Sequence, residues 1–138
     1  MEAERSRPPR VLIVDDDARL VFVMQEVLGD AGYETKVAPD GHAAIQRLST
    51  FAPDVIVLDL MMPHLSGYDV LGWLKENDFA IPVVVATTDD DSRARDLGAA
   101  VKLTKPFTPR AAPRRRRGGA AARAGLAALA LHAFQPVP

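Results

Sequence analysis

Solid blocks of apolar residues mark most of the strands predicted along the chain. Val11–Val14, Val55–Leu58 and Ile81–Ala86 contain no charged side chain and do not alternate with polar residues. Strands that are covered on both faces of a parallel sheet have this pattern. Less uniform segments predict two further strands, over residues 33–38 and 100–103.

Apolar residues at helical spacing occupy the intervals between these strands. They predict helices over residues 20–28, 41–48, 68–75 and 92–97. Strand and helix therefore alternate with short connections, which predicts a doubly wound α/β fold built on a parallel sheet.

Polar residues stand at the carboxyl ends of four predicted strands, where the ligand site of such a sheet lies. They are Asp15, Asp16, Asp59, Thr87 and Lys105. Two unit charges about 4 Å apart repel by roughly 4 kcal/mol at an effective dielectric near 20, so three clustered carboxylates predict a bound divalent cation. Oxygen ligands without His or Cys favour Mg²⁺ or Mn²⁺. A hard metal beside a lysine and a threonine hydroxyl is typical of a site that handles phosphoryl groups.

Four segments in order carry a resemblance to a known family: VLIVDDD, VIVLDLMMP, VVVATT and LTKPF. Together they resemble the receiver domains of two-component response regulators, over residues 10–107. The resemblance implies a flavodoxin-like sheet of five parallel strands in the order 2-1-3-4-5. It also implies a role for each site residue: Asp59 as phosphoacceptor; Asp15, Asp16, Asp59 and the backbone carbonyl of Met61 as metal ligands; Lys105, Thr87 and Thr88 as the phosphate-binding groups.

The function implied by this resemblance is a signalling switch. A sensor histidine kinase or a phosphotransfer protein would donate the phosphoryl group, and a downstream protein or a second copy of the chain would respond to it. Beyond self-catalysed phosphotransfer and slow autodephosphorylation, no enzyme activity is expected. A hydrolytic phosphatase would need a second carboxylate two residues after Asp59, where Met61 stands.

The absence of cysteine excludes disulfides, thiolate catalysis and Cys-ligated zinc. The apolar runs are too short to span a bilayer, and residues 1–10 have no apolar secretion signal. We therefore expect a cytoplasmic protein with no membrane partner.

Charge is distributed unevenly along the chain. All 18 acidic residues lie in residues 1–100, whereas residues 101–138 contain eight of the 17 basic residues. An alternative function is therefore a nucleic-acid-binding regulator that uses the run Arg114–Arg117. Four arginines without interleaved aromatic residues are weak evidence, and we do not expect nucleic acid among the partners.

Three segments follow from these patterns: a flexible leader over residues 1–9, a receiver domain over 10–107, and an atypical basic Ala/Arg-rich segment over 108–138. A helix predicted over residues 120–134 is a candidate for a displaced fifth helix. Lys105 follows Thr87 by 18 positions. This is about four fewer than is usual in the family, so the fourth helix should be roughly one turn short. Lys102 occupies the position at which the family commonly has an aromatic or other switch residue.

Simpler structural roles remain open for several of these residues. Asp17 is expected to cap the first helix and not to bind metal. Asp15 and Asp16 could be turn residues, and Thr87 and Thr88 could cap the next helix. Asp89–Asp91 is expected to be a solvated loop.

Overall fold

The computed structural model describes residues 7–62, 64–87, 96–105, 107–109 and 134–136. Strands and helices alternate through most of this part of the chain. In order they are β1 (Arg10–Val14), α2 (Ala18–Asp30), β2 (Glu34–Ala38), α3 (Gly41–Phe51), β3 (Val55–Leu58), α4 (Gly67–Glu76), β4 (Val83–Thr87), β5 (Val101–Thr104), β6 (Phe107–Pro109) and β7 (Phe134–Pro136).

Five of the described strands form one sheet, in the order β2-β1-β3-β4-β5, and β6 and β7 form a separate two-stranded sheet. Every neighbouring pair in the five-stranded sheet is parallel. Since the apolar strands β1, β3 and β4 are adjacent, they form the centre of the sheet. The predicted flavodoxin-like parallel α/β class is confirmed.

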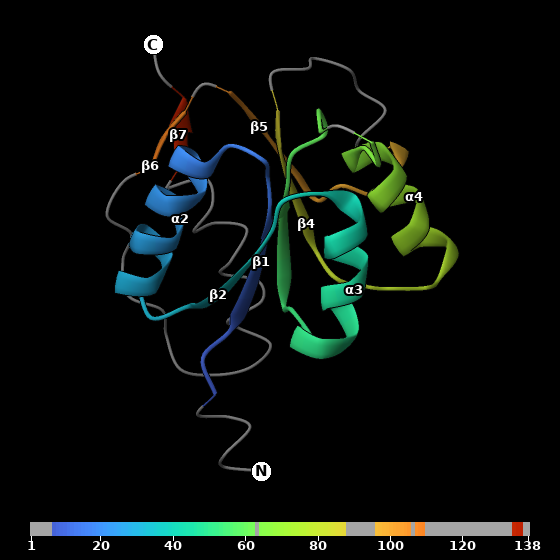
Figure 1. The fold of residues 1–138 in the computed structure, drawn as a ribbon, viewed down its shortest axis with the longest axis horizontal. Coiled ribbons are helices and arrows are strands. Elements are labelled where there is room, and N and C mark those ends of the chain that lie inside the picture. Colours follow the sequence, from blue (N-terminus) through green and yellow to red (C-terminus); the bar gives the residue numbers. More distant parts are fainter. Residues whose placement is uncertain (1–6, 63, 88–95, 106, 110–133, 137–138) are drawn as a thin grey trace.

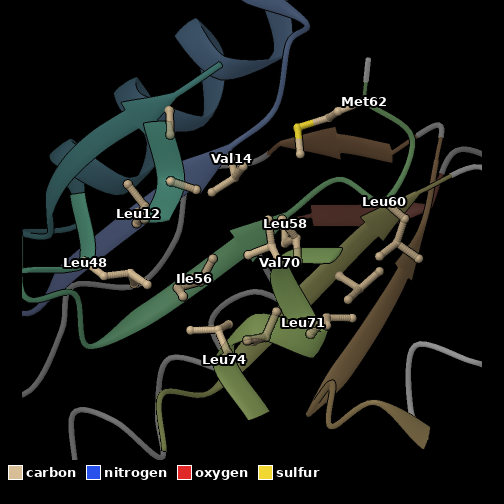
Figure 2. Packing of buried hydrophobic residues seen from close by; sticks show 14 of the residues in the cluster. Leu12, Val14, Leu48, Ile56, Leu58, Leu60, Met62, Val70, Leu71 and Leu74 are labelled. Carbon is tan, nitrogen blue, oxygen red and sulfur yellow. The ribbon is translucent and has the colours of Figure 1, made fainter. Parts of the chain in front are cut away.

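The two faces of the sheet bury different halves of each central strand, because successive side chains of a strand point to opposite faces. Val11 and Ile13 pack with Met24 of α2 on one face. Leu12 and Val14 pack on the other with residues of α3 and α4 (Figures 1 and 2). The continuous apolar runs of the sequence therefore supply two cores, one on each side of the sheet.

The helix boundaries lie within a few residues of the predicted ones. The largest difference is at α3, which continues to Phe51 and stops where Ala52 adopts a left-handed backbone with a φ of 52°. Most of the predicted helix over residues 92–97, with its expected shortening, lies outside the described residues. No helix in the described ranges has both the length and the apolar character needed to cross a membrane.

The end of the predicted leader is attached to the sheet. Pro9 is buried, and its carbonyl accepts a hydrogen bond of 3.0 Å from the backbone N–H of Glu34. The guanidinium of Arg7 lies 3.6 Å from the carboxylate of Asp54. Two of the last three residues of the predicted leader, Arg7 and Pro9, therefore contact the domain.

The helix predicted over residues 120–134 is wrong at its last residue. Phe134 lies in β7, which pairs antiparallel with β6; the rest of that predicted helix lies outside the described residues. A proline disfavours helical backbone in the residue before it. Gln135 precedes Pro136 and Thr108 precedes Pro109, so the central residue of each short strand is extended for this reason.

The β6–β7 ribbon lies on the α2 side of the sheet (Figure 1). β6 contacts α2, and β7 contacts β5, the edge strand of the sheet. The first two residues of the atypical segment predicted over residues 108–138 therefore lie in a strand, β6.

Deletion of residues 134–138 should lower the thermal stability of the protein. β6 would lose its only strand partner in the described part of the chain, and its backbone groups would return to water. We expect a loss of about 1 kcal/mol, or roughly 3–4 °C in Tm. Thermal unfolding followed by circular dichroism measures it. A shorter deletion of residues 137–138 is the control, and equal Tm values for both deletions would show that β7 stabilises nothing.

Candidate functional site

The carboxyl ends of β1, β3, β4 and β5 meet at one edge of the sheet because these strands are adjacent and parallel. Backbone hydrogen bonds extend two of the ladders beyond the strands. The N–H of Asp59 donates to the carbonyl of Val14 at 2.9 Å, and that of Lys105 donates to the carbonyl of Thr87 at 2.8 Å. The positions of Asp59 and Lys105 are therefore fixed by the sheet itself.

Three carboxylates lie together at this edge. One oxygen from each of Asp15, Asp16 and Asp59 lies within 4.8 Å of the others. Asp15 and Asp59 are buried, whereas Asp16 is exposed to solvent. Two buried carboxylates at this separation repel strongly unless a cation lies between or beside them.

The ammonium of Lys105 supplies one such cation. Its Nζ lies 2.8 Å from Oδ2 of Asp15 and 3.4 Å from Oδ2 of Asp59. All three side chains are largely buried, with 16% of Lys105, 2% of Asp15 and 7% of Asp59 exposed. Lys105 thus forms ion pairs with both carboxylates and lies closer to that of Asp15.

The burial of Asp59 raises the pKa of its carboxyl group above the ordinary value. The negative charge of Asp15 adds to this rise, while the Met61 N–H and Lys105 oppose it. Burial alone would lower the pKa of Lys105, but its hydrogen bond to Asp15 and the two negative charges outweigh burial and raise that pKa. The ammonium form of Lys105 is therefore firmly held.

The loop between β3 and α4 shapes the surroundings of Asp59. Oδ1 of Asp59 accepts a hydrogen bond of 3.0 Å from the N–H of Met61, whose residue is 59% exposed. The next residue, Met62, is buried in the core on the α3 and α4 face (Figure 2). Of the two methionines in this loop, only Met62 is part of the core.

Gly67, the first residue of α4, lies against the backbone of Asp59 and Leu60. A Cβ at this position would overlap the carbonyl oxygen of Asp59 and the Cα of Leu60. The Gly67 N–H also donates to the carbonyl of Leu60 at 3.1 Å. Gly67 directly precedes the helix predicted over residues 68–75, and its support of the site was not predicted. A glycine at the start of an amphipathic helix, eight residues after Asp59, was the available signal.

Asp17 has the structural role expected of it. Its side chain accepts hydrogen bonds from the N–H groups of Arg19 and Leu20 and so caps α2. Its own N–H donates to Oδ1 of Asp15 at 2.9 Å. The cap therefore also helps to orient the buried carboxylate of Asp15.

Only some of the remaining predicted site residues lie in the described part of the chain. Thr87, the last residue of β4, is fully buried beside the site. Thr88 and Asp89–Asp91 lie outside the described residues. The backbone of Lys102 is part of β5, and its side chain is outside the described part.

Comparison with known proteins gives a consistent result along the same part of the chain. The model of the response regulator receiver domain family matches residues 11–114. The chain is 36% identical over 105 residues to the alkaline phosphatase synthesis transcriptional regulatory protein PhoP of Bacillus subtilis, covering 73% of the chain and 44% of that protein. It is also 36% identical over 105 residues to the DNA-binding response regulator MtrA of Mycobacterium leprae, covering 73% and 46%. The chain thus spans less than half the length of these curated relatives.

Solved structures support the same fold. The receiver domain of the Francisella response regulator 1452 has a TM-score of 0.68 and 34% identity, covering 72% of this chain and 86% of that one. The Vibrio cholerae chemotaxis protein CheY4 has a TM-score of 0.68 and 29% identity, covering 74% and 90%.

Replacement of Gly67 by alanine should destabilise the protein by roughly 2–3 kcal/mol, because the new methyl group overlaps backbone that cannot move without shifting Asp59. Gly72 is the matched control on the same helix: a Cβ there meets nothing within 4 Å. Gly72→Ala should stabilise by about 0.5–1 kcal/mol. Urea unfolding measures both. Similar effects of the two variants would contradict the close approach at Gly67.

Replacement of Asp16 by alanine should raise the Tm measured in chelator, by roughly 2–4 °C, because one of three crowded negative charges is removed. Mg²⁺ should raise the Tm of the parent protein and should not raise that of this variant. Glu26→Ala, which removes an exposed charge from α2, is the control and should behave as the parent does. A lower Tm for Asp16→Ala in chelator would show that the three carboxylates do not repel one another.

Proposed function

The chain belongs to the receiver domain family of two-component response regulators, and from this premise we propose that it is a phosphorylation switch with Asp59 as the phosphoacceptor. The observation that carries the proposal is the position of Asp59. It is a buried carboxylate at the end of a central strand, with Lys105 Nζ 3.4 Å away and two more carboxylates beside it.

The donor set fits a hard divalent cation. The three clustered carboxylates supply oxygen ligands only, and we assign the backbone carbonyl of Met61 as a further ligand. This chemistry suits Mg²⁺ or Mn²⁺. When bound, the cation would offset the negative charge of the carboxylates and of an incoming phosphoryl group.

The proposed reaction moves one phosphoryl group. A carboxylate oxygen of Asp59 forms a bond to phosphorus, and the bond from phosphorus to a histidine nitrogen of the donor breaks. The donor nitrogen retains the electron pair, and because the other nitrogen of the phosphohistidine ring carries a proton, the donor leaves as a neutral imidazole. The donor is a sensor histidine kinase or a phosphotransfer protein.

The residues around Asp59 have distinct parts in this reaction. The Met61 N–H and the sheet ladder hold the Asp59 carboxylate in place. The ammonium of Lys105 would neutralise the transferred group, and Thr87 and Thr88 would bind its oxygens. No separate substrate is turned over, and the acyl phosphate would be lost by slow autodephosphorylation.

The output of the switch is a second part of the proposal. We propose that phosphorylation changes contacts with a downstream protein or a second copy of the chain. The relatives named as transcriptional or DNA-binding regulators favour a further candidate function, a role in DNA binding. Because of these relatives, the expectation that nucleic acid is not a partner has no support. Duplex DNA binding measured at several salt concentrations, with and without replacement of Arg114–Arg117 by glutamine, tests whether that run takes part.

Incubation with acetyl phosphate and Mg²⁺ should add one phosphoryl group to the parent protein and none to Asp59→Asn, because the amide of asparagine is not a nucleophile for this reaction. Intact-mass spectrometry measures the product. Asp17→Asn is the matched control: it changes a neighbouring aspartate that caps α2, asparagine caps equally well, and labelling should persist. Labelling of Asp59→Asn equal to that of the parent would overturn the assignment.

A further inference from the structure

The loop between β3 and α4 is neither helix nor strand in the residues that the structure describes. Contacts at both of its ends hold it. The Met61 N–H donates to Oδ1 of Asp59, and Met62 is buried in the core. At the other end, Gly67 lies against the backbone of Asp59. Residues 64–66 lie between these contacts and need a support of their own, because a segment without regular hydrogen bonds otherwise moves readily.

Gly41, the first residue of α3, supplies that support. A Cβ at Gly41 would lie 2.8 Å from Cδ2 and from the carbonyl oxygen of the half-buried Leu65, and 2.9 Å from its Cγ. Non-bonded carbon atoms pack about 3.5–4.0 Å apart, so Leu65 can lie this close to α3 only because Gly41 has no side chain. Gly41 does not have a left-handed φ. The close approach alone therefore requires glycine at this position.

The start of α3 is itself held in place. The side chain of Asp40 caps the helix by accepting the N–H of Ala43 at 2.8 Å. The carbonyl of Ala38, at the end of β2, accepts the N–H of Asp15 at 3.2 Å. α3 and α4 also contact each other on one face of the sheet (Figure 1). A displacement at the contact with Leu65 would therefore be taken up by the loop and not by α3.

The backbone just before Leu65 is strained. His64 has a φ of 66°, in the left-handed region that residues other than glycine rarely adopt. Strain of this kind persists only where the surrounding contacts hold the backbone in place. The contact between Leu65 and Gly41 directly follows this residue, so it is one of the contacts that hold the loop.

We propose that Gly41 is a positioning residue of the site, which acts through Leu65 on the loop that carries Met61. The proposal rests on the function proposed above and adds to it a residue outside the clustered carboxylates. Contact of Leu65 with α3 keeps the Met61 N–H on Asp59, and it keeps the Met61 carbonyl in place as the ligand assigned above. Misplacement of a group near a reacting centre by about 1 Å can lower a rate roughly a hundredfold.

Replacement of Gly41 by alanine tests the proposal first in chelator, without any cation. The new methyl group should displace Leu65 and the loop, so the hydrogen bond from the Met61 N–H to Asp59 should lengthen and weaken. The amide proton resonance of Met61 should then move upfield. Isotope labelling of methionine in the NMR sample selects this resonance, and its absence from Met61→Leu assigns it. An unchanged Met61 resonance overturns the proposal.

The amide resonance of Met24 is the internal control for this measurement. Met24 lies in α2 and packs in the core on the other face of the sheet. It should not move in Gly41→Ala, because well below the Tm a general loss of stability leaves the folded state and its shifts unchanged. Equal movement of the Met24 and Met61 resonances would show a general rearrangement and overturn the proposal.

Gly41→Ala should also weaken the binding of Mg²⁺, with a Kd about tenfold higher than that of the parent, because residues that orient metal ligands have effects of this size. Mg²⁺ is sensitive to such a displacement since it demands nearly ideal octahedral geometry. Isothermal titration calorimetry measures the Kd. Gly29→Ala is the matched control: a Cβ there meets nothing within 4 Å, and the Kd should stay within about twofold of the parent value. Equal weakening in both variants overturns the proposal, as does a parent that binds no Mg²⁺.

A double-mutant cycle identifies Leu65 as the contact through which Gly41 acts. Leu65→Ala removes the two side-chain atoms that the new methyl group of Gly41→Ala would meet. The two substitutions together should therefore raise the Kd by less than the product of their separate factors. Factors that multiply would show that the two residues act independently, and would overturn the proposal.

If Gly41→Ala does not fold, Leu65→Ala provides the test, because it shortens a side chain and introduces no overlap. Loss of this contact should move the Met61 resonance upfield and raise the Kd for Mg²⁺; no change in either overturns the proposal. None of these measurements involves phosphorylation. A parent that accepts no phosphoryl group from acetyl phosphate, while Gly41→Ala still moves the Met61 resonance and raises the Kd, would refute the proposed function alone.

Discussion

The repulsion among Asp15, Asp16 and Asp59 is the constraint on which the rest of the site depends. Parallel strands with adjacent carboxyl ends bring these three carboxylates within 4.8 Å of one another, and two of them are buried. The fold can hold such a cluster only if positive charge and rigid backbone oppose it. Lys105 supplies the charge. The sheet ladder, the Met61 N–H and the close approach of Gly67 supply the rigidity.

The surroundings of Asp59 act on the pKa of its carboxyl group in opposite directions. Burial favours the neutral carboxyl and raises its pKa, while Lys105 and the Met61 N–H favour the carboxylate form that the proposed role of Asp59 as phosphoacceptor requires. A site with only the first effect would be unreactive. A site with only the second would hold Asp59 in a tight ion pair with Lys105. The Nζ of Lys105 lies 2.8 Å from Oδ2 of Asp15 and 3.4 Å from Oδ2 of Asp59. The ion pair with Asp59 is therefore the weaker of the two.

Most of the sheet could be predicted because its strands are apolar on both faces, which only a doubly covered sheet explains. The site could be predicted for a related reason: polar residues directly after such strands must meet at one edge. The contacts within the site could not be predicted from the sequence. The spacing of Asp15, Asp59 and Lys105 in the sequence does not reveal which carboxylate the ammonium prefers. That choice depends on differences of less than 1 Å set by loop backbone. The role of Gly67 likewise depends on how closely two backbone segments approach.

The strand β7 was not predicted, because the Ala/Arg-rich composition of the segment was given more weight than the backbone preference imposed by its prolines. Alanine and arginine favour helix, and they dominate residues 110–133, but the prolines at 109 and 136 favour extended backbone in their neighbours. This has a consequence for the site. β6 begins two residues after Lys105 and pairs with β7, while the N–H of Lys105 is bonded to β4. The loop that carries the ammonium is thus held between two hydrogen-bonded segments. β7, near the C-terminal end of the chain, therefore pairs with a strand that begins two residues after Lys105, the residue whose charge balances the three carboxylates.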